Sequence, residues 1–212
     1  DNIRHAKYMS YIYCACILVA AILHGFRLLR EQYPRIVLYT SKIPLFPSCV
    51  ALCRMVGYAR IKIGPWRLPA GRYLVICGCF ILGTVVWCFA MTPHYKTHND
   101  VGSPPLAIRA GMMAVGMLPF IFALALKLNP ISLLTGVSHV HLQYYHQVSS
   151  IMFLFFSIVH TVPFIWQPLR EEGFERLKFV WHDSYTTYWS GTVAIFFLLW
   201  ICASSLGIFR HM

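Results

Sequence analysis

The sequence predicts an all-α integral membrane protein, a bundle of five transmembrane helices, and two observations support this class. Hydrophobic residues make up 58% of the 212 residues, charged residues only 12%, and the mean hydropathy is +0.60. A soluble fold of this size could not cover so much apolar surface. The apolar residues are also gathered into long runs, with the charged residues between them. The bilayer is therefore the better solvent for this chain.

Each predicted span is long enough to cross about 30 Å of hydrocarbon, which takes roughly 20 helical residues. The first span begins close to residue 1, but it is too long for the apolar region of a signal peptide, and no small-residue cleavage site follows it. We therefore interpret it as a retained span. The five spans cover residues 8–26, 73–92, 106–126, 141–166 and 189–209.

The charged residues predict how the chain is oriented in the membrane. Residues 27–72 hold one acid, Glu31, whereas residues 167–188 carry both signs. The positive-inside rule places the first segment in the cytoplasm and the second outside, so the N-terminus is predicted to be extracellular. Because topology explains the net charge of +11, no nucleic-acid partner is predicted. The basic residues of the first segment are Arg27, Arg30, Arg35, Lys42, Arg54, Arg60, Lys62, Arg67 and Arg72.

The cysteines predict no disulfide framework, because most lie within spans, where cysteine behaves as a small apolar residue. Cys49 and Cys53 lie in the basic segment at helical spacing. Packing is the favoured interpretation of this pair, and a metal pair or a palmitoylation site is the alternative.

Two histidines of the fourth span share one helix face. His146 and His160 are 14 residues apart, so they differ by about 40° after roughly four turns, and the rise between them is about 21 Å. This rise fits one site near each leaflet of a bilayer. A polar ring within the membrane is costly unless it is paired, and haem iron accepts a neutral imidazole as an axial ligand. The pair therefore predicts two haem sites.

The alternative for each histidine is a hydrogen bond to a neighbouring helix, with no further role. His139 shares the face of His146, but it lies at the predicted cytoplasmic boundary, where a solvated loop residue is favoured. His141 points to another face. The remaining histidines lie at span ends or in loops, where solvated histidines are ordinary, although His94 and His98 are candidate contacts for a metal substrate outside.

Three runs of the sequence resemble fungal ferric reductases, which belong to the wider ferric reductase-like transmembrane superfamily that includes the NADPH oxidases. The resemblance extends from about the second span to residue 212. The first span fits as well, because fungal ferric reductases carry an extra helix before the six-helix core shared with the oxidases. The runs are NPISLLTG at 129–136, LQYYHQ at 142–147 and VHTVPF at 159–164.

The resemblance implies an NADPH-dependent ferric-chelate reductase. NADPH would reduce FAD in the cytoplasm, and electrons would cross through two b-type haems to a ferric or cupric chelate outside. Each haem would be held by two histidines, one of them from the fourth span, with His146 at the inner haem and His160 at the outer. The implied location is the plasma membrane. The implied partners are membrane lipid and the chelates, with coupling to an iron permease or oxidase also open.

Arg109 opens the third span at about the level of His160. The arginine fork suits a carboxylate, so a propionate of the outer haem is a natural partner. The family's oxidases also place an arginine beside the outer haem. The alternative is an arginine that extends to the outer headgroups, as a position near a helix end allows.

Two departures from the family pattern affect the prediction. The oxidases carry a further histidine one turn after the outer ligand, where this chain has Phe164, and this favours a metalloreductase over a superoxide-producing oxidase. The chain also ends at Met212, before the helix expected to supply the opposing histidines, and His211 is no substitute for them. The sequence holds no glycine-rich dinucleotide fingerprint either.

We therefore expect an incomplete part of a di-haem transmembrane core that is inactive alone. Residues 1–72 would form the first transmembrane helix and the basic cytoplasmic loop. Residues 73–212 would form the ferric reductase-like domain, truncated before the remaining haem-ligand helix and the FAD and NADPH domains. The alternatives are the membrane domain of a superoxide-producing NADPH oxidase and a non-enzymatic multi-span protein whose histidines are only hydrogen-bonded.

Overall fold

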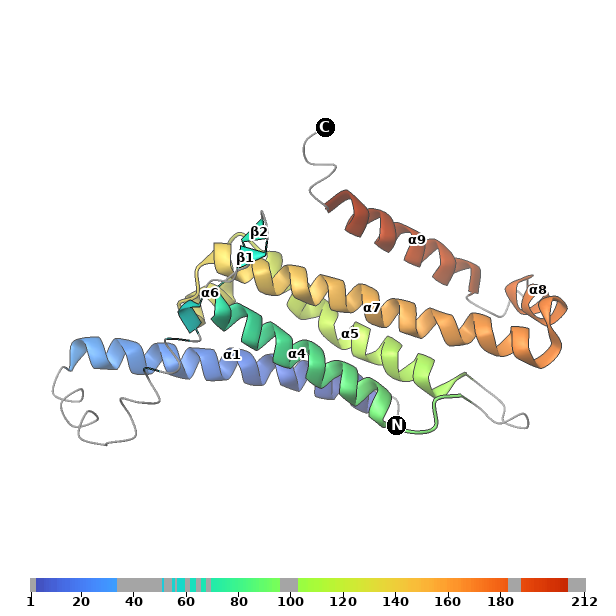
Figure 1. Cartoon of the computed structure of the whole chain (residues 1–212), viewed down its shortest axis with the longest axis horizontal. Helices are drawn as coiled ribbons and strands as arrows, with labels where there is room; N and C mark the ends of the chain where they lie inside the picture. The colour runs from blue at the N-terminus through green and yellow to red at the C-terminus, as the bar shows by residue number, and fades with distance from the viewer. Residues whose placement is uncertain are drawn as a thin grey trace. The chain divides into compact units, whose positions relative to one another are not determined.

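The computed structural model describes residues 3–33, 70–95, 103–182 and 188–205, together with positions 51, 55, 57–59, 62–63 and 66–67 (Figure 1). Five of its helices are long and apolar enough to cross a membrane, as predicted. These helices are α1 (Ile3–Gln32), α4 (Gly71–Ala90), α5 (Pro105–Ala125), α7 (His139–Glu172) and α9 (Tyr188–Ser205).

Within the part of the chain that the structure describes, four short elements with defined bounds lie between the long helices. The strands β1 (Lys62–Ile63) and β2 (Trp66–Arg67) form a two-residue antiparallel hairpin. This hairpin is the one addition to the predicted all-helical class within the described residues. The short helices are α6 (Pro130–Thr135) and α8 (Phe174–His182).

The fourth span differs from its prediction at both ends. Its helix α7 has 34 residues, whereas the apolar run covers only 141–166. At 1.5 Å per residue it is about 51 Å long, well beyond the roughly 30 Å of hydrocarbon. The helix includes His139, which we predicted as a loop residue, because helix formation starts directly after the glycine-containing turn. Polar residues at both ends of α7 therefore extend the helix beyond its apolar part.

The long helices expose much of their apolar surface. The most hydrophobic stretch of α9 buries none of its residues and that of α1 only 6%, whereas α5 buries 44%. Large side chains such as Leu23, Phe26 and Trp200 are exposed. Such surfaces fit lipid better than water. The chain is an integral membrane protein, and α5 is its most enclosed span.

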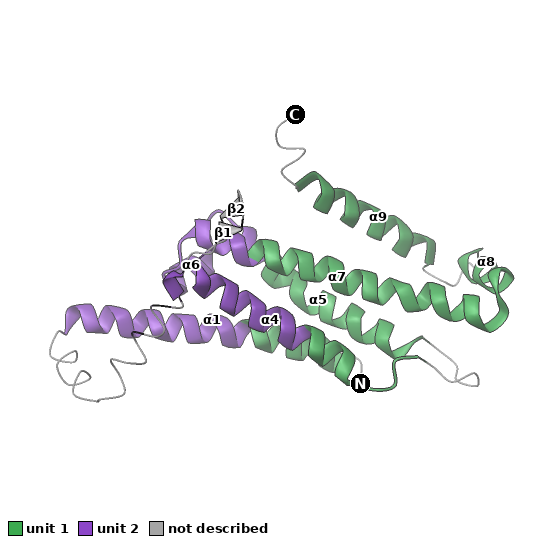
Figure 2. Ribbon diagram, in the orientation of Figure 1, with its two compact units in different colours: residues 1–13, 85–122, 146–212 green, residues 14–84, 123–145 purple. Residues whose placement is uncertain are grey.

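The chain divides into two compact units, each discontinuous in sequence (Figure 2). Unit 1 consists of residues 1–13, 85–122 and 146–212, and unit 2 of residues 14–84 and 123–145. The predicted division into residues 1–72 and 73–212 concerns domains of the sequence rather than compact units, and it stays a prediction.

Unit 2 contains the first run of the family resemblance, which forms the capped helix α6. The Asn129 side chain accepts a hydrogen bond from the Ile131 amide at 2.9 Å and donates one to the Leu124 carbonyl. Pro130 follows at the first helical position, where its missing N–H costs nothing. Gly136 ends the helix with φ +64°, a left-handed conformation that favours glycine. The run is thus a self-contained helix with both ends satisfied.

Aromatic rings gather around Tyr73 in the same unit. The Tyr73 ring stacks on His141 at a centroid distance of 5.3 Å and on Tyr144 at 5.6 Å, and the Arg72 guanidinium lies 4.9 Å from its centroid.

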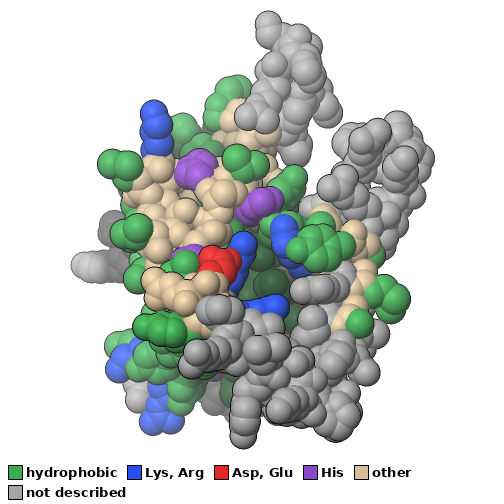
Figure 3. Space-filling model, turned by 90° about the vertical axis from the view of Figure 1, so that its left-hand side faces the viewer, with side chains coloured by type: hydrophobic (Ala, Val, Ile, Leu, Met, Phe, Trp, Pro, Cys, Tyr) green, Lys and Arg blue, Asp and Glu red, His purple; other side chains and the backbone are tan. Residues whose placement is uncertain are grey.

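On the face shown in Figure 3, basic and histidine side chains are more frequent than acidic ones. Most of the predicted basic segment 27–72 lies outside the described residues, and the orientation stays a prediction.

In unit 1, the first residues of α1 pack closely on α5. A Cβ at Gly116 would lie 2.6 Å from the Ala6 carbonyl oxygen and 3.0 Å from the Met9 Cβ, so only glycine permits this approach. The buried Tyr13 stacks on Phe120 at 4.6 Å, and its hydroxyl lies 2.8 Å from the Ser149 hydroxyl. The start of α1 is therefore part of the packed unit.

Gly116→Leu is expected to destabilise the protein by about 1–3 kcal/mol, because a side chain there overpacks the contact between α1 and α5. The measurement is the thermal unfolding midpoint in detergent micelles. Gly83→Leu is the matched control, since nothing lies within 4 Å of a Cβ at Gly83. Equal midpoints for the two variants would contradict the close contact.

Candidate functional site

The two predicted histidines of α7 both make hydrogen bonds to backbone carbonyls of α5. His146 Nδ1 lies 3.0 Å from the Ile121 carbonyl oxygen, and His160 Nδ1 lies 2.7 Å from the Ala107 carbonyl oxygen. The two carbonyls are 14 residues apart, as are the two histidines. Because α5 and α7 run in opposite directions, equal spacing lets both bonds form along one pair of helices. All four residues belong to unit 1.

These bonds determine the tautomer of each ring. A carbonyl oxygen only accepts, so the Nδ1 atom must carry the proton and donate it. The lone pair of the neutral ring then resides on Nε2. Metal-binding histidines commonly donate their other ring N–H to a carbonyl or carboxylate in this way, which fixes the ring and raises its basicity as a ligand. Both rings are therefore prepared to bind a metal through Nε2.

Gly111 allows the His160 ring to approach α5. A Cβ at this position would lie 2.5 Å from His160 Nδ1 and 2.8 Å from its Cε1. Any larger residue would move the ring away from the Ala107 carbonyl. We did not predict this residue from the sequence, although a glycine within a long apolar helix is a known signal of close approach.

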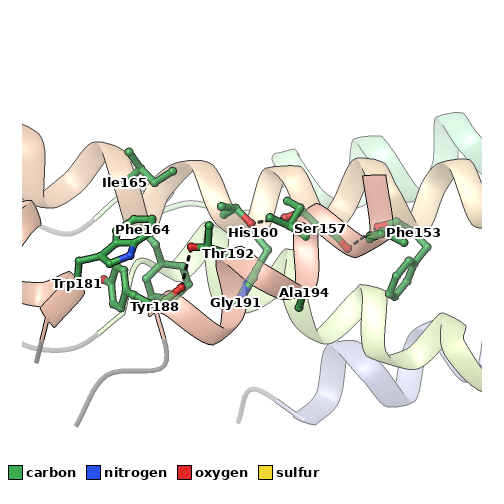
Figure 4. A pocket seen from close by; sticks show the side chains of 13 residues that line it. Phe153, Ser157, His160, Phe164, Ile165, Trp181, Tyr188, Gly191, Thr192 and Ala194 are labelled. Atoms are coloured by element: carbon green, nitrogen blue, oxygen red, sulfur yellow. Dashed lines mark hydrogen bonds between the residues drawn. The ribbon is translucent and has the colours of Figure 1, made fainter. Parts of the chain in front are cut away.

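Two apolar cavities adjoin His160, each of about 400 Å³. One lies among α7, α8 and α9, and Figure 4 shows the side chains that line it. The other is bounded by α5 and α7 and includes Gly111. Phe153, Ser157 and His160 line both. The volumes are typical of ligand sites, and the apolar walls suit a large, mostly apolar group.

Three hydroxyl groups in the walls of the cavity shown in Figure 4 are already hydrogen-bonded. The hydroxyl groups of Ser157, Thr161 and Thr192 donate to backbone carbonyls one turn earlier in their own helices, at 2.8–2.9 Å. No lining residue is charged. The other polar groups of the lining side chains are the His160 ring, the Trp181 N–H and the Tyr188 hydroxyl, in otherwise apolar surroundings.

The donor set fits haem better than a bare metal ion. Among the described residues, no group of three or more His, Cys, Asp or Glu side chains is placed to hold an ion. A haem iron needs only one or two protein ligands, because the porphyrin supplies the other four. His160, an anchored histidine beside apolar space, satisfies that requirement, whereas His146 lines neither of these two cavities.

Arg109 lies on α5 but points away from His160. Its guanidinium is 6% exposed, and its Nη1 atom donates to the Cys88 carbonyl at 2.7 Å and to the Met91 carbonyl at 2.6 Å. These carbonyls end α4, where the helix dipole favours a cation. Arg109 lies two positions before Gly111, so the two point about 200° apart around α5. The contacts thus join α5 to α4, and they do not bring Arg109 to His160.

The other predicted histidines have local partners or lie outside the described residues. His94 Nε2 lies 2.9 Å from the Phe89 carbonyl near the end of α4, and His139 lies 3.4 Å from the Gln143 amide. His98, His211 and the pair Cys49 and Cys53 lie outside the described residues.

Residues 110–212 match the family model described as "Ferric reductase like transmembrane component". The chain is 42% identical over 141 residues to "Ferric/cupric reductase transmembrane component 7" of Saccharomyces cerevisiae, a match that covers 66% of this chain and 22% of that protein. It is 35% identical over 181 residues to "Probable cell surface ferric reductase kap2" of Aspergillus oryzae, covering 80% of this chain and 23% of that protein. The chain thus spans less than a quarter of the length of these curated relatives. No solved structure matches it significantly.

Gly111→Ala is expected to displace the His160 ring and break its bond to the Ala107 carbonyl. Nitrogen NMR of histidine-labelled protein, assigned with His146→Gln and His160→Gln, reports which ring nitrogen is protonated. We expect a proton on Nδ1 of both rings, and loss of this state at His160 alone in the Gly111→Ala protein. Gly191→Ala is the control, because Gly191 lines the other cavity beside His160 and nothing lies within 4 Å of its Cβ position. A ring that stays protonated on Nδ1 in both variants would contradict the role of Gly111.

Proposed function

Since residues 110–212 belong to the ferric reductase like transmembrane family, we propose that this chain is the electron-transferring membrane part of a metalloreductase. Electrons from cytoplasmic NADPH and FAD would cross through b-type haems to a ferric or cupric chelate on the other side. The observation that carries this proposal is the matched pair of Nδ1–carbonyl bonds at His146 and His160.

The two histidines would each hold one haem through Nε2. Haem would supply reversible one-electron chemistry at its iron. The rise of about 21 Å between the rings allows one site towards each face of the membrane. We propose that His146 serves the inner site and His160 the outer.

The protein residues act here by position rather than by proton transfer. The α5 carbonyls orient both rings, Gly111 lets α5 approach, and the apolar walls exclude water from the His160 cavity. No acid, base or nucleophile is needed, because only electrons move. A low-dielectric surrounding and the basicity of the ligands are the means by which such a site sets redox potential.

Arg109 remains a candidate partner for a propionate of the outer haem. Its Nη1 atom already caps α4, so a propionate would have to use the other nitrogens of the guanidinium. The same cation would then stabilise a helix end and a carboxylate. We propose this role as secondary to the structural one.

The remaining parts of the proposal concern location. The basic segment 27–72 would face the cytoplasm and the α8 region the exterior. The relative from Aspergillus oryzae is named a cell surface protein, which supports a plasma membrane location. FAD and NADPH would bind to other regions of the protein, and ferric or cupric chelates would be the external acceptors. Coupling to an iron permease or oxidase is a further proposal.

Phe164 favours a metalloreductase over an oxidase. Its ring packs edge-to-face on His160 at a centroid distance of 5.1 Å. A phenyl ring offers no hydrogen bond to oxygen or superoxide, so it leaves the site apolar where an oxidase has a histidine. A superoxide-producing oxidase is therefore the second candidate.

His146→Ala and His160→Ala, each in the full-length gene product, are expected to remove about half of the bound haem, because each deletes one ligand of one site. The measurements are haem per protein and the reduced-minus-oxidised spectrum. His182→Ala on α8 is the control, since that side chain is exposed. Full haem content in either α7 variant would refute the ligand assignment, and no haem in the unaltered protein would favour a non-enzymatic bundle.

Under saturating ferric chelate in air, we expect metal reduction to exceed superoxide production clearly. Phe164→His is expected to raise the superoxide share, because it restores a hydrogen-bonding ring beside the outer site. Parallel assays of ferrous product and superoxide give the ratio. Equal output of the two products in the unaltered protein would reverse the order of the two candidates.

A further inference from the structure

Four aromatic rings form an unbroken series that starts at His160. The centroid of Phe164 lies 5.1 Å from His160, that of Tyr188 lies 5.6 Å from Phe164, and that of Trp181 lies 6.1 Å from Tyr188. The rings come from α7, α9 and α8, and they line the cavity shown in Figure 4. All four belong to unit 1. Each consecutive pair is within the range of direct aromatic contact.

A charged chelate is not expected to enter this cavity. None of the lining residues carries a charge, and the hydroxyl groups of Ser157, Thr161 and Thr192 already donate to backbone carbonyls. Moving an ion into such surroundings without a partner is strongly unfavourable. An acceptor of this kind would therefore stop at the edge of the cavity and take its electron there.

The series ends on residues suited to that edge. Trp181 and Tyr188 are half-buried, and both line the cavity. Trp181 is contributed by α8, whose neighbouring Phe179 is 62% exposed. The helix α8 also carries charges of both signs, including Glu175 and Arg176. The rings thus connect the interior of the site to a polar surface.

We propose that Trp181 and Tyr188 form the contact surface for the external acceptor, a chelated ferric ion whose organic ligand presents an aromatic or apolar face. This inference rests on the proposed function. Trp181 binds the ligand face, and Phe164 and Tyr188 fill the space back to His160 with packed rings in place of water. One electron would pass from the group held at His160 to the ferric ion, which would become ferrous. No proton moves, and no covalent bond changes.

The contact is tested with a redox-inert probe, gallium(III) catecholate, on the haem-loaded full-length gene product. Trp181→Leu keeps the cavity wall apolar and removes the π face. We expect it to weaken binding of the probe about three- to tenfold, the range that one aromatic contact supplies. Gallium(III) citrate, which has no aromatic face, should bind equally to both proteins. Trp181→Phe is expected to restore most of the loss.

The electron step is tested by rapid mixing of the reduced protein with ferric catecholate. We expect Trp181→Leu to slow reoxidation about tenfold, equivalent to roughly 1.4 kcal/mol in the barrier, while haem content and reduction by NADPH are unchanged. Trp189→Leu is the matched control, because Trp189 is 61% exposed and lies outside the ring series. If Trp181→Leu loses haem, the reoxidation rates of Trp181→Phe and Trp181→Met are compared instead, because these two variants also differ in the presence of an aromatic ring.

The outcomes separate the two proposals. An unaltered protein without haem, or with haem that NADPH does not reduce, refutes the proposed function. A haem-loaded protein in which Trp181→Leu binds the gallium probe and reoxidises like the unaltered protein refutes the contact surface alone. An equal loss in the Trp189→Leu control also refutes it, because the effect would then not depend on the ring series.

Discussion

The structure depends on two hydrogen bonds from imidazole Nδ1 atoms of α7 to backbone carbonyls of α5. In a membrane, an unpaired ring nitrogen has no water to satisfy it, so the bond that orients each ring also makes its burial tolerable. Since the partners are carbonyls, the bonds leave His146 and His160 with their lone pairs on Nε2. Orientation, protonation and availability of the ligand atom thus follow from one contact.

The helix α5 makes this contact possible because small residues line it. Gly111 admits the His160 ring on one side, and Gly116 admits α1 on another. These glycines are five residues apart, about 140° around the helix, so α5 is approached closely from two directions within unit 1. The same helix holds Arg109, which caps α4. The most enclosed span, α5, therefore positions α1, α4 and α7 through direct contacts.

Hydropathy and helical spacing were sufficient to predict the five spans and the shared face of the two histidines, because both depend on local periodicity. The partners of these histidines could not be predicted, since a backbone carbonyl has no signal in the sequence and the pairing of α5 with α7 is a long-range contact. The role of Arg109 was underdetermined for a related reason. Its helix position was clear, but the direction of its side chain depends on where α4 ends. The extent of α7 was also missed, because apolar content sets the span while polar residues continue the helix.

The equal spacing of donors on α7 and acceptors on α5 has a mechanical consequence. Both hydrogen bonds join the same two helices, α5 and α7. Neither helix can therefore slide along the other without disturbing both bonds. A displacement of one helical turn, 5.4 Å, would misalign both rings at once. The distance between the two imidazoles is thus fixed at two points, so a shift imposed at one end of the helix pair is transmitted to the other.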